Sequence, residues 1–404
     1  MSARTYDVLN PNLGPDLYAL LERLRRDDPV HRSEQLRGVV LTRHADVQGL
    51  LRDGKLISAN ASARIQRLPP EQRDSLAPLA AWVSRWITCA GPEGHARLQS
   101  VLGRYFTPRT VESLRPVAQA NLDALLARVA PAEVEVIKEL THPFPATIIA
   151  HMLGIPPGND EHIHGWSENI TRLFTHNDHE QLLRTQSSVA EMLDFMRPLI
   201  AARREEPRDD LLSVLVKAQA EGLVVDEDEI LANCGLLLFA GHETTARLLV
   251  HGLKALLEHP EQLAALREQP SLRANAIEEM LRFDGPAGTI VRISLTPLTI
   301  DAVTIAAGEP VFLCLAAANR DGAVFAEPDR FDITRANARK NLAFGTGLFY
   351  CLGAALARME ADVFFETLLR RYSRIEALDP SEWLYFPPFN RGLARYRVRL
   401  TPAA

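Results

Sequence analysis

The pattern of apolar and polar positions predicts a chain that is helical over most of residues 14–280. Prolines should begin or end several of these helices, at Pro92, Pro108, Pro131, Pro143 and Pro207. Glycine-led or alternating segments rich in β-branched residues predict strands in four places, at 38–42, 290–305, 311–315 and 396–400. We therefore expect a mainly α fold with a smaller β portion, organised as one domain over residues 1–404.

The strongest helical pattern lies between an acidic start at 226–229 and a stop at His259-Pro260. The helix between them would have roughly 30 residues, which is long for a globular protein. Its middle, 234–241, is apolar all round, so we expect this helix to run through the core. Glu243 and Thr244 follow at once, although a buried carboxylate is costly unless it is paired.

A second region places a cysteine between a glycine-rich loop and a helical pattern. Residues 344–353 read Phe-Gly-Thr-Gly-Leu-Phe-Tyr-Cys-Leu-Gly, and apolar residues at helical spacing follow Cys351. Unpaired backbone N–H groups and the helix dipole at that position favour a thiolate. Gly345 permits a positive φ or a close approach, and Gly353 leaves room for a flat ligand. This is what an axial haem ligand requires; an inert buried cysteine is the alternative.

Composition narrows the possible partners and compartments. Of 404 residues, 47% are hydrophobic and 24% charged, as in ordinary globular proteins, and the net charge of −6 gives no reason to expect a nucleic acid. Neither a signal peptide nor an apolar run of about 18 residues is visible, so we expect no membrane association. The widely spaced cysteines indicate a reducing cytoplasm rather than a disulfide framework; they are Cys89, Cys234, Cys314 and Cys351.

Over nearly its full length, the chain resembles the cytochrome P450 family of haem-thiolate monooxygenases. The run 344–353 is similar to the family's haem-binding loop, and 240–245, Ala-Gly-His-Glu-Thr-Thr, is similar to its Ala-Gly-x-(Asp/Glu)-Thr-Thr signature. The resemblance implies a triangular-prism helical body around a buried haem b, with Cys351 as the iron ligand. It also implies haem contacts from Phe344, Gly345, Phe349 and Gly353.

In this family the acid and the alcohol have separate roles. Gly241, which costs a helix about 1 kcal/mol relative to Ala, would loosen the helix above the iron and leave room for dioxygen beside Ala240. Thr244 would hydrogen-bond the dioxygen and hold a water, while Glu243 would relay protons from solvent. The residue types alone also allow a structural reading. Thr244 can bond back to the carbonyl of Ala240, with Glu243 in a salt bridge.

A structural network is implied by Glu279 and Arg282, which stand three apart on a predicted helix. That spacing is weak evidence by itself. The resemblance adds Arg330 as a third member and implies that the three residues brace the cysteine loop. A planar guanidinium that bonds two acceptors at once suits such a brace, so we interpret the network as structural rather than catalytic.

Haem propionates need cationic or hydrogen-bonding partners, and the resemblance implies Arg292 and His95 in this role. Two positions depart from the family pattern: Gln99 replaces a usual arginine, and Phe349 replaces a usual histidine or arginine. Gln99 can still donate a hydrogen bond, whereas Phe349 cannot. We expect weaker propionate anchoring, partly relieved by Arg97, and a shifted haem potential. Because Phe349 would lie toward the proximal face, we also expect an unusual choice of electron donor.

By resemblance, the substrate pocket draws on 59–88, 161–207, the long helix, 287–291 and the turn at 389–390. Its candidate lining residues are Trp82, Ile87, Phe174, Leu236, Phe239, Ile290 and Phe389. The same apolar residues could equally serve as core. A histidine group also lies in this region, at His162, His164, His176 and His179, and its spacing fits a solvated helix pair better than a metal site.

The leading hypothesis is a monooxygenase that uses O2 to hydroxylate or otherwise oxidise a small organic substrate in specialised metabolism, free or bound to a carrier protein. No nucleotide-binding Gly-x-Gly-x-x-Gly segment is present, so electrons should come from a ferredoxin and its NAD(P)H-dependent reductase. The same haem chemistry could serve oxidative coupling, desaturation or peroxide-driven oxidation. Alternatives from other classes are a non-catalytic haem sensor or carrier and a helical scaffold without cofactor.

Overall fold

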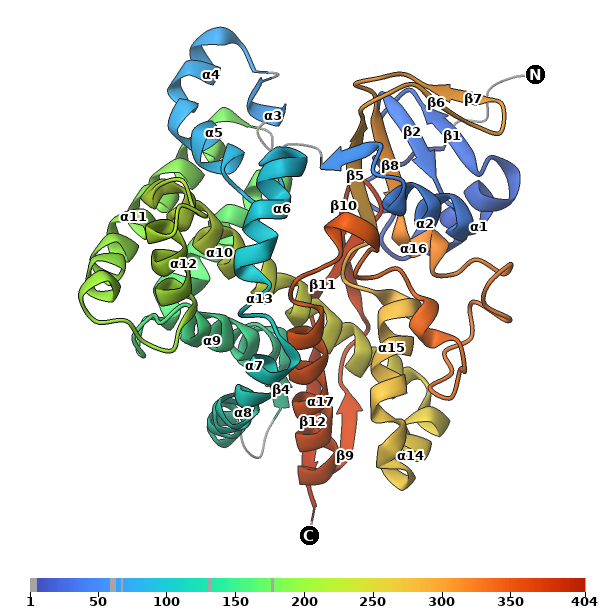
Figure 1. The fold of residues 1–404 in the computed structure, drawn as a ribbon. Helices are drawn as coiled ribbons and strands as arrows, with labels where there is room; N and C mark the ends of the chain where they lie inside the picture. Colours follow the sequence, from blue (N-terminus) through green and yellow to red (C-terminus); the bar gives the residue numbers. More distant parts are fainter. Residues whose placement is uncertain (1–5, 59–62, 67, 130–132, 176–177, 404) are drawn as a thin grey trace.

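The computed structural model describes residues 6–58, 63–66, 68–129, 133–175 and 178–403. Helices form most of the body, and a sheet-bearing region near the N-terminus covers one corner (Figure 1). The first helices are α1 Leu17–Asp27, α2 His44–Arg52, α3 Ala63–Gln66, α4 Pro70–Ser75, α5 Ala77–Ser84, α6 Gly91–Leu102, α7 Pro108–Ser113, α8 Arg115–Val129 and α9 Pro143–Met152. The remaining helices are α10 Asp160–Thr175, α11 His179–Glu205, α12 Leu211–Ala220, α13 Glu227–Glu258, α14 Pro260–Glu268, α15 Arg273–Asp284, α16 Leu315–Ala318 and α17 Ala354–Arg371.

The strands are short and most of them lie at the two ends of the chain. They are β1 Val30–Ser33, β2 Gly38–Leu41, β3 Leu56–Ser58, β4 Glu133–Glu135, β5 Thr289–Ser294, β6 Leu298–Ile300, β7 Val303–Ile305, β8 Pro310–Cys314, β9 Tyr372–Ala377, β10 Glu382–Phe386, β11 Asn390–Arg395 and β12 Arg397–Pro402. Short helical segments of other types are η1 Ile137–Thr141, a π-helix, and the 3-10 turns η2 Pro270–Leu272, η3 Ala338–Lys340 and η4 Gly347–Phe349.

The largest sheet joins the N-terminal strands to those that follow α15, in the order β1-β2-β8-β5-β3. Within it β2 and β8 are parallel and the other neighbours antiparallel. A three-stranded sheet, β4-β12-β9, brings the C-terminus beside residues 133–135. The predicted mainly α fold with a smaller β portion is therefore confirmed, as are strands in all four predicted segments.

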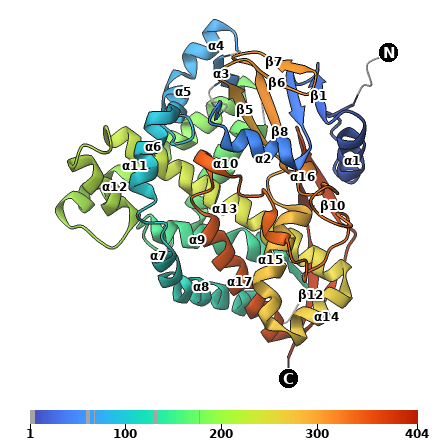
Figure 2. The same cartoon turned by 45° about the vertical axis from the view of Figure 1, so that its right-hand side comes forward.

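Helix α13 is the long helix that the sequence predicts, and it crosses the middle of the molecule between α10 and α15 (Figures 1 and 2). The carboxylate of Asp226 caps its start by accepting a hydrogen bond from the backbone N–H of Glu229 at 2.8 Å, and the helix ends before His259-Pro260. Most of its residues are buried, and its apolar ones contribute to the main hydrophobic core. Among the described residues, no helix is long and apolar enough to cross a membrane.

Candidate active site

The loop before α17 is closed by its own backbone. The N–H of Cys351 donates to the carbonyl of Phe344 at 3.1 Å, and the N–H of Gly345 donates to the carbonyl of Leu342 at 2.8 Å. Gly345 and Gly347 have φ values of 67° and 76°, which side chains rarely adopt. A Cβ on Gly347 would also collide with the carbonyl of Leu51. Both glycines are thus required for the loop to hold its shape against α2.

Cys351 lies three residues before the first residue of α17 and has exposed surface. A Cβ added to Gly353 would meet only the Cys351 sulfur, at 4.0 Å, so the space beside the thiol is open. Protein groups nevertheless crowd the sulfur. This burial raises the pKa of the Cys351 thiol, while the Gly353 N–H and the charge of Arg358 act in the opposite direction. The helix terminus alone therefore does not lower the thiol pKa as predicted, and a bound metal would be needed to deprotonate it fully.

His95 and Arg292 meet at Phe349. The Phe349 ring packs edge-on against the His95 ring at 4.4 Å between centroids, and the Arg292 guanidinium carbon lies over the Phe349 ring, 5.0 Å from its centroid. The ring nitrogens of His95 lie 3.1 Å from the carbonyl of Ile87 and 3.0 Å from that of Leu348. The structure thus brings together three residues that the sequence predicts beside the haem, from α6, β5 and the cysteine loop.

Arg292 is buried with hydrogen-bonding capacity left over. Nη1 donates to the carbonyl of Val291 at 3.1 Å, but Nε has no partner among the described residues. Burial lowers the pKa of Arg292 to about 10. A buried guanidinium with an unused donor suits an anionic ligand group.

The remaining predicted haem neighbours are placed differently. Gln99 is half-buried on α6 and lines a hollow of about 580 Å³ that Cys351 and Arg339 also line. Arg97 instead forms a two-pronged ion pair with Glu229, at 2.6 and 2.8 Å, so the expectation that it relieves the propionate anchoring is wrong. Phe349 itself is half-buried and contacts both His95 and Arg292. Its neighbours Leu348 and Tyr350 carry the exposed surface of this segment.

An accessible strip interrupts the buried middle of α13. Ala240 is half-buried and Thr244, one turn later, is exposed, although their neighbours on the helix are largely buried. The Thr244 hydroxyl donates to the carbonyl of Ala240 at 2.8 Å. Glu243 is buried and pairs with Arg247 at 3.9 Å. Both features of the structural reading are therefore present, and the strip leaves Thr244 within reach of a ligand.

Gly241 also has a packing function. A Cβ at this position would lie 3.3 Å from the side chain of Ile149, so the glycine lets α13 approach α9 closely. Its carbonyl accepts a hydrogen bond from the Thr245 hydroxyl at 3.1 Å. The helix is continuous through this residue. The proposed room for dioxygen stays a prediction.

The structural brace is present, but its third member is Arg335 rather than Arg330. The Glu279 carboxylate accepts from Arg282 at 2.6 and 2.7 Å and from Arg335 Nε at 3.1 Å. The side chain of Arg330 is exposed and pairs with Glu327 at 3.3 Å. The backbone carbonyl of Arg330, however, accepts from both of the other arginines at 3.0 Å. A motif spacing cannot distinguish a side chain from a carbonyl at the same position.

The candidate pocket residues divide into two groups. Phe239 and Ile290 are half-buried, and Ile290 approaches the cysteine loop at Gly345. The others with described side chains are buried: Trp82, Ile87, Leu236 and Phe389. Phe389 has 0% exposure and packs with Tyr385 in a smaller core cluster, which favours its alternative interpretation as a core residue. The side chain of Phe174 lies outside the described part of the chain.

The histidines group differently from the sequence expectation. His176 lies outside the described residues, and His162 stacks on Trp166 with 5.6 Å between ring centroids. His164 instead lies with His142 and His242, which come from distant segments. Only their meeting in space reveals this group, because no local spacing connects them.

Comparisons with known proteins agree on one family. The model of the family described as Cytochrome P450 matches residues 169–382. Cytochrome P450 107B1 of Saccharopolyspora erythraea is 36% identical over 387 residues, which cover 93% of each chain. The cyclomarin C epoxidase CymV of Salinispora arenicola is 34% identical and covers 90% of each chain. The crystal structure of P450BioI with a hexadec-9Z-enoic acid-ligated acyl carrier protein has a TM-score of 0.87 and 30% identity, with 98% of this chain and 99% of that chain covered.

Proposed function

Because this chain belongs to the cytochrome P450 family and is a haem-thiolate monooxygenase, we propose that it oxidises a small organic molecule of specialised metabolism with O2. Hydroxylation is the simplest outcome. The relatives support this class of substrate without specifying one, since they include enzymes whose names state different oxidations. The observation that carries the proposal is the accessible strip of α13, where the Thr244 hydroxyl is exposed in the middle of an otherwise buried helix.

Haem b is the cofactor of this family, and the residues present fit it. Cys351 would ligate the iron, Gly353 leaves space beside the sulfur, and the unused Nε of Arg292 would meet a propionate. Both ring nitrogens of His95 lie at hydrogen-bonding distance from backbone carbonyls, so His95 would have to release one of them to bind a propionate. When bound, the haem supplies dioxygen activation, with the thiolate pushing electron density that favours O–O cleavage. Phe349 lies beside Arg292, but its side chain has no hydrogen-bond donor. Anchoring of the propionates would therefore depend largely on Arg292.

The chain's own polar groups would control protons and water. The Thr244 hydroxyl donates to the carbonyl of Ala240, and its oxygen can still accept a hydrogen bond from a water or a reacting group. Glu243 pairs with Arg247. Because adjacent helix positions do not face each other, Glu243 and Thr244 point in different directions from α13. Glu243 would therefore transfer protons to the site through water molecules, and the Thr244 hydroxyl would hydrogen-bond the water that delivers the proton. Phe239 and Ile290 would supply apolar contacts to the substrate.

The electron donor would be a ferredoxin reduced by its NAD(P)H-dependent reductase, docked at the hollow outside Cys351. Arg339, with an exposed side chain at the rim, would attract an acidic donor. Arg339→Glu should slow ferredoxin-driven turnover about tenfold at low salt, less at high salt, and leave turnover with added hydrogen peroxide unchanged. Arg184→Glu, which reverses an exposed charge on α11, is the matched control. Equal slowing in both variants would contradict this docking site.

The experiment that tests the assignment is the spectrum of the dithionite-reduced protein with and without carbon monoxide. A strongly red-shifted Soret band is expected for thiolate ligation by Cys351. The Cys351→Ser variant should lack this band. Substrates can then be screened by the spin-state change that they cause. The screen should offer free acids and the same acyl groups on a carrier protein, since one relative was solved with such a carrier. A band typical of histidine or neutral ligation would contradict the assignment.

A further inference from the structure

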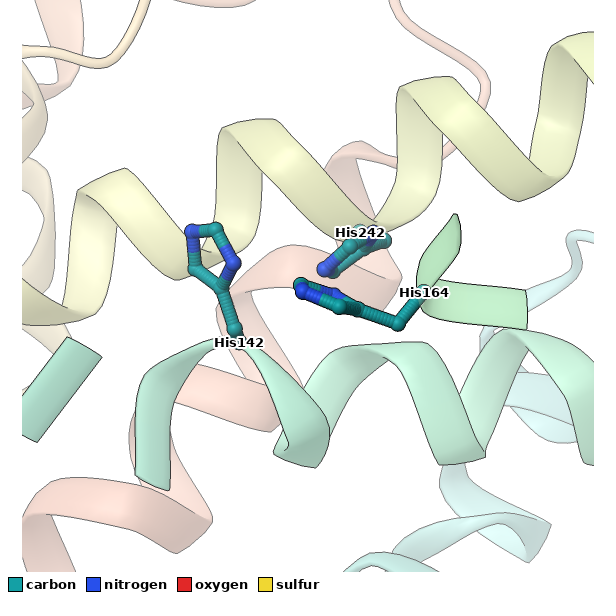
Figure 3. A group of neighbouring side chains, drawn as sticks. All are labelled: His142, His164 and His242. Carbon is teal, nitrogen blue, oxygen red and sulfur yellow. The ribbon is translucent and has the colours of Figure 1, made fainter. Parts of the chain in front are cut away.

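Three histidines from distant segments meet behind α13. His142 stands at the junction of η1 and α9, His164 lies on α10 and His242 lies on α13. Figure 3 shows the three imidazoles gathered in the space between α13 and the neighbouring helices. His242 directly precedes Glu243 and belongs to the same turn as the accessible strip. The cluster therefore adjoins the active site without being part of it.

The spacing of the rings fits a transition-metal ion. One nitrogen from each histidine lies within 4.8 Å of the other two. The ring centroids are separated by 5.2 Å for His142–His242, 5.8 Å for His142–His164 and 6.1 Å for His164–His242. In a tetrahedral zinc site with Zn–N distances of about 2.0–2.1 Å, two ligand nitrogens are roughly 3.4 Å apart. Small side-chain rotations would bring the three nitrogens to that distance.

His242 is prepared as a ligand in two ways. Its side chain is 0% exposed, and Nδ1 lies 2.8 Å from the Ser167 hydroxyl, while Nε2 has no hydrogen-bond partner among the described residues. A metal-binding histidine usually donates its other ring N–H to an oxygen acceptor, and the Ser167 hydroxyl can accept that hydrogen bond from Nδ1. Burial, aided by the other two histidines, lowers the pKa of His242 to about 3. Burial also lowers the pKa of His142.

We propose that His142, His164 and His242 bind one divalent transition-metal ion, best fitted by zinc with water as the fourth ligand. His164 is exposed, so the ion can enter from solvent and keep a water on that side. The ion ties α10 and the η1–α9 junction to α13. Packing of neutral rings alone would leave Nε2 of His242 buried without a partner, which metal binding corrects.

The test is a calorimetric titration with ZnCl2 of the untagged holoenzyme, from which bound metal has first been removed with a chelator. The haem-loaded protein is used because its iron occupies Cys351 and removes that thiol as a competing zinc ligand. One zinc per haem is expected, and His164→Ala should weaken binding at least about tenfold. His164 is exposed, so this variant should fold. His162→Ala, an exposed histidine on the same helix that stacks on Trp166, is the matched control and should bind zinc as the native protein does.

X-ray absorption at the zinc edge gives an independent result that needs no variant. Three imidazole nitrogens at about 2.0–2.1 Å are expected in the native holoenzyme. Sulfur ligands, or fewer than three imidazoles, would overturn the proposal. So would absence of binding, or equal zinc affinity in the native protein and His164→Ala. Because the thiolate–CO spectrum is measured separately, failure of the zinc site leaves the haem assignment intact.

Discussion

Two buried arginines, Arg282 on α15 and Arg292 on β5, show how differently a fold can use one side chain. Arg282, 1% exposed, donates to both oxygens of Glu279 and to the carbonyls of Asn319, Pro328 and Arg330. Arg292, 8% exposed, donates to the carbonyl of Val291 and keeps Nε without a partner among the described residues. The first is satisfied by the protein alone.

The difference separates structure from binding. A buried cation whose donors all meet protein groups stabilises the fold, and removing its partner leaves an uncompensated charge. A buried cation with unused hydrogen-bond donors is suited to bind an anionic group of a ligand. Burial lowers the pKa of Arg292 to about 10. Keeping this side chain charged while no ligand is bound therefore lowers the free energy of unfolding by an amount on the order of 3 kcal/mol. An anionic propionate would offset that penalty.

The largest expected effect comes from breaking the satisfied network. Glu279→Gln leaves Arg282 buried without its counter-charge, so the free energy of unfolding should fall by about 3–5 kcal/mol. Urea unfolding of the holoenzyme, followed by fluorescence and by the Soret band, measures this loss. A fall below 1 kcal/mol would mean that the brace is not an energetic unit.

The third member of the brace can be tested by two arginines. Arg335 is buried against Glu279, so Arg335→Ala should lower the free energy of unfolding by about 1.5–3 kcal/mol. Arg330 contributes a carbonyl to the brace and a side chain to an exposed pair, so Arg330→Ala should cost less than about 1 kcal/mol. The reverse order would restore the arrangement predicted from the sequence.

Removing the unsatisfied cation should affect haem rather than folding. In Arg292→Met, haem should pass to excess apomyoglobin about 10 to 100 times faster, because a charge-assisted hydrogen bond is lost. The free energy of unfolding of the haem-free protein should stay the same or rise. Arg292→Lys keeps the charge and should retain most of the affinity. If Arg292→Met instead destabilises the haem-free protein as Glu279→Gln does, the two arginines are alike and the comparison fails.

The same contrast applies to two neighbouring hydroxyls on α13. Thr244 and Thr245 both donate to carbonyls four residues earlier, but Thr244 is exposed and Thr245 is buried. Thr244→Ala should lower the product formed per O2 consumed roughly tenfold, the equivalent of one hydrogen bond of about 1.4 kcal/mol. Oxygen-electrode and product assays measure this ratio. Thr245→Ala should change stability and leave the coupling near the native value, and uncoupling in both variants would remove the distinction.

How far the sequence could predict the molecule follows from the range of each interaction. Helix α13 was predictable from its cap at Asp226 and its stop at Pro260, because both act within one turn. The cysteine loop was predictable because glycines and a thiol act locally. Arg335 and the pairing of Arg97 with Glu229 were not, since those choices depend on side chains brought together by folding. The histidine cluster could not be predicted either, because its three members come from distant segments.

The smallest expected effect comes from adding a donor where the chain lacks one. Phe349 contacts both His95 and the Arg292 guanidinium, so Phe349→His would place a hydrogen-bonding ring beside that guanidinium. One additional hydrogen bond from a neutral donor at this half-buried position should contribute about 0.5–1.5 kcal/mol, so haem loss should slow about two- to tenfold, and the added donor should raise the haem potential. Phe349→Leu, which removes the ring without adding a donor, separates this effect from lost packing. Haem loss and potential equal to those of the native protein in Phe349→His would show that Arg292 already anchors the propionates in full, and that the aromatic ring at this position carries no functional cost.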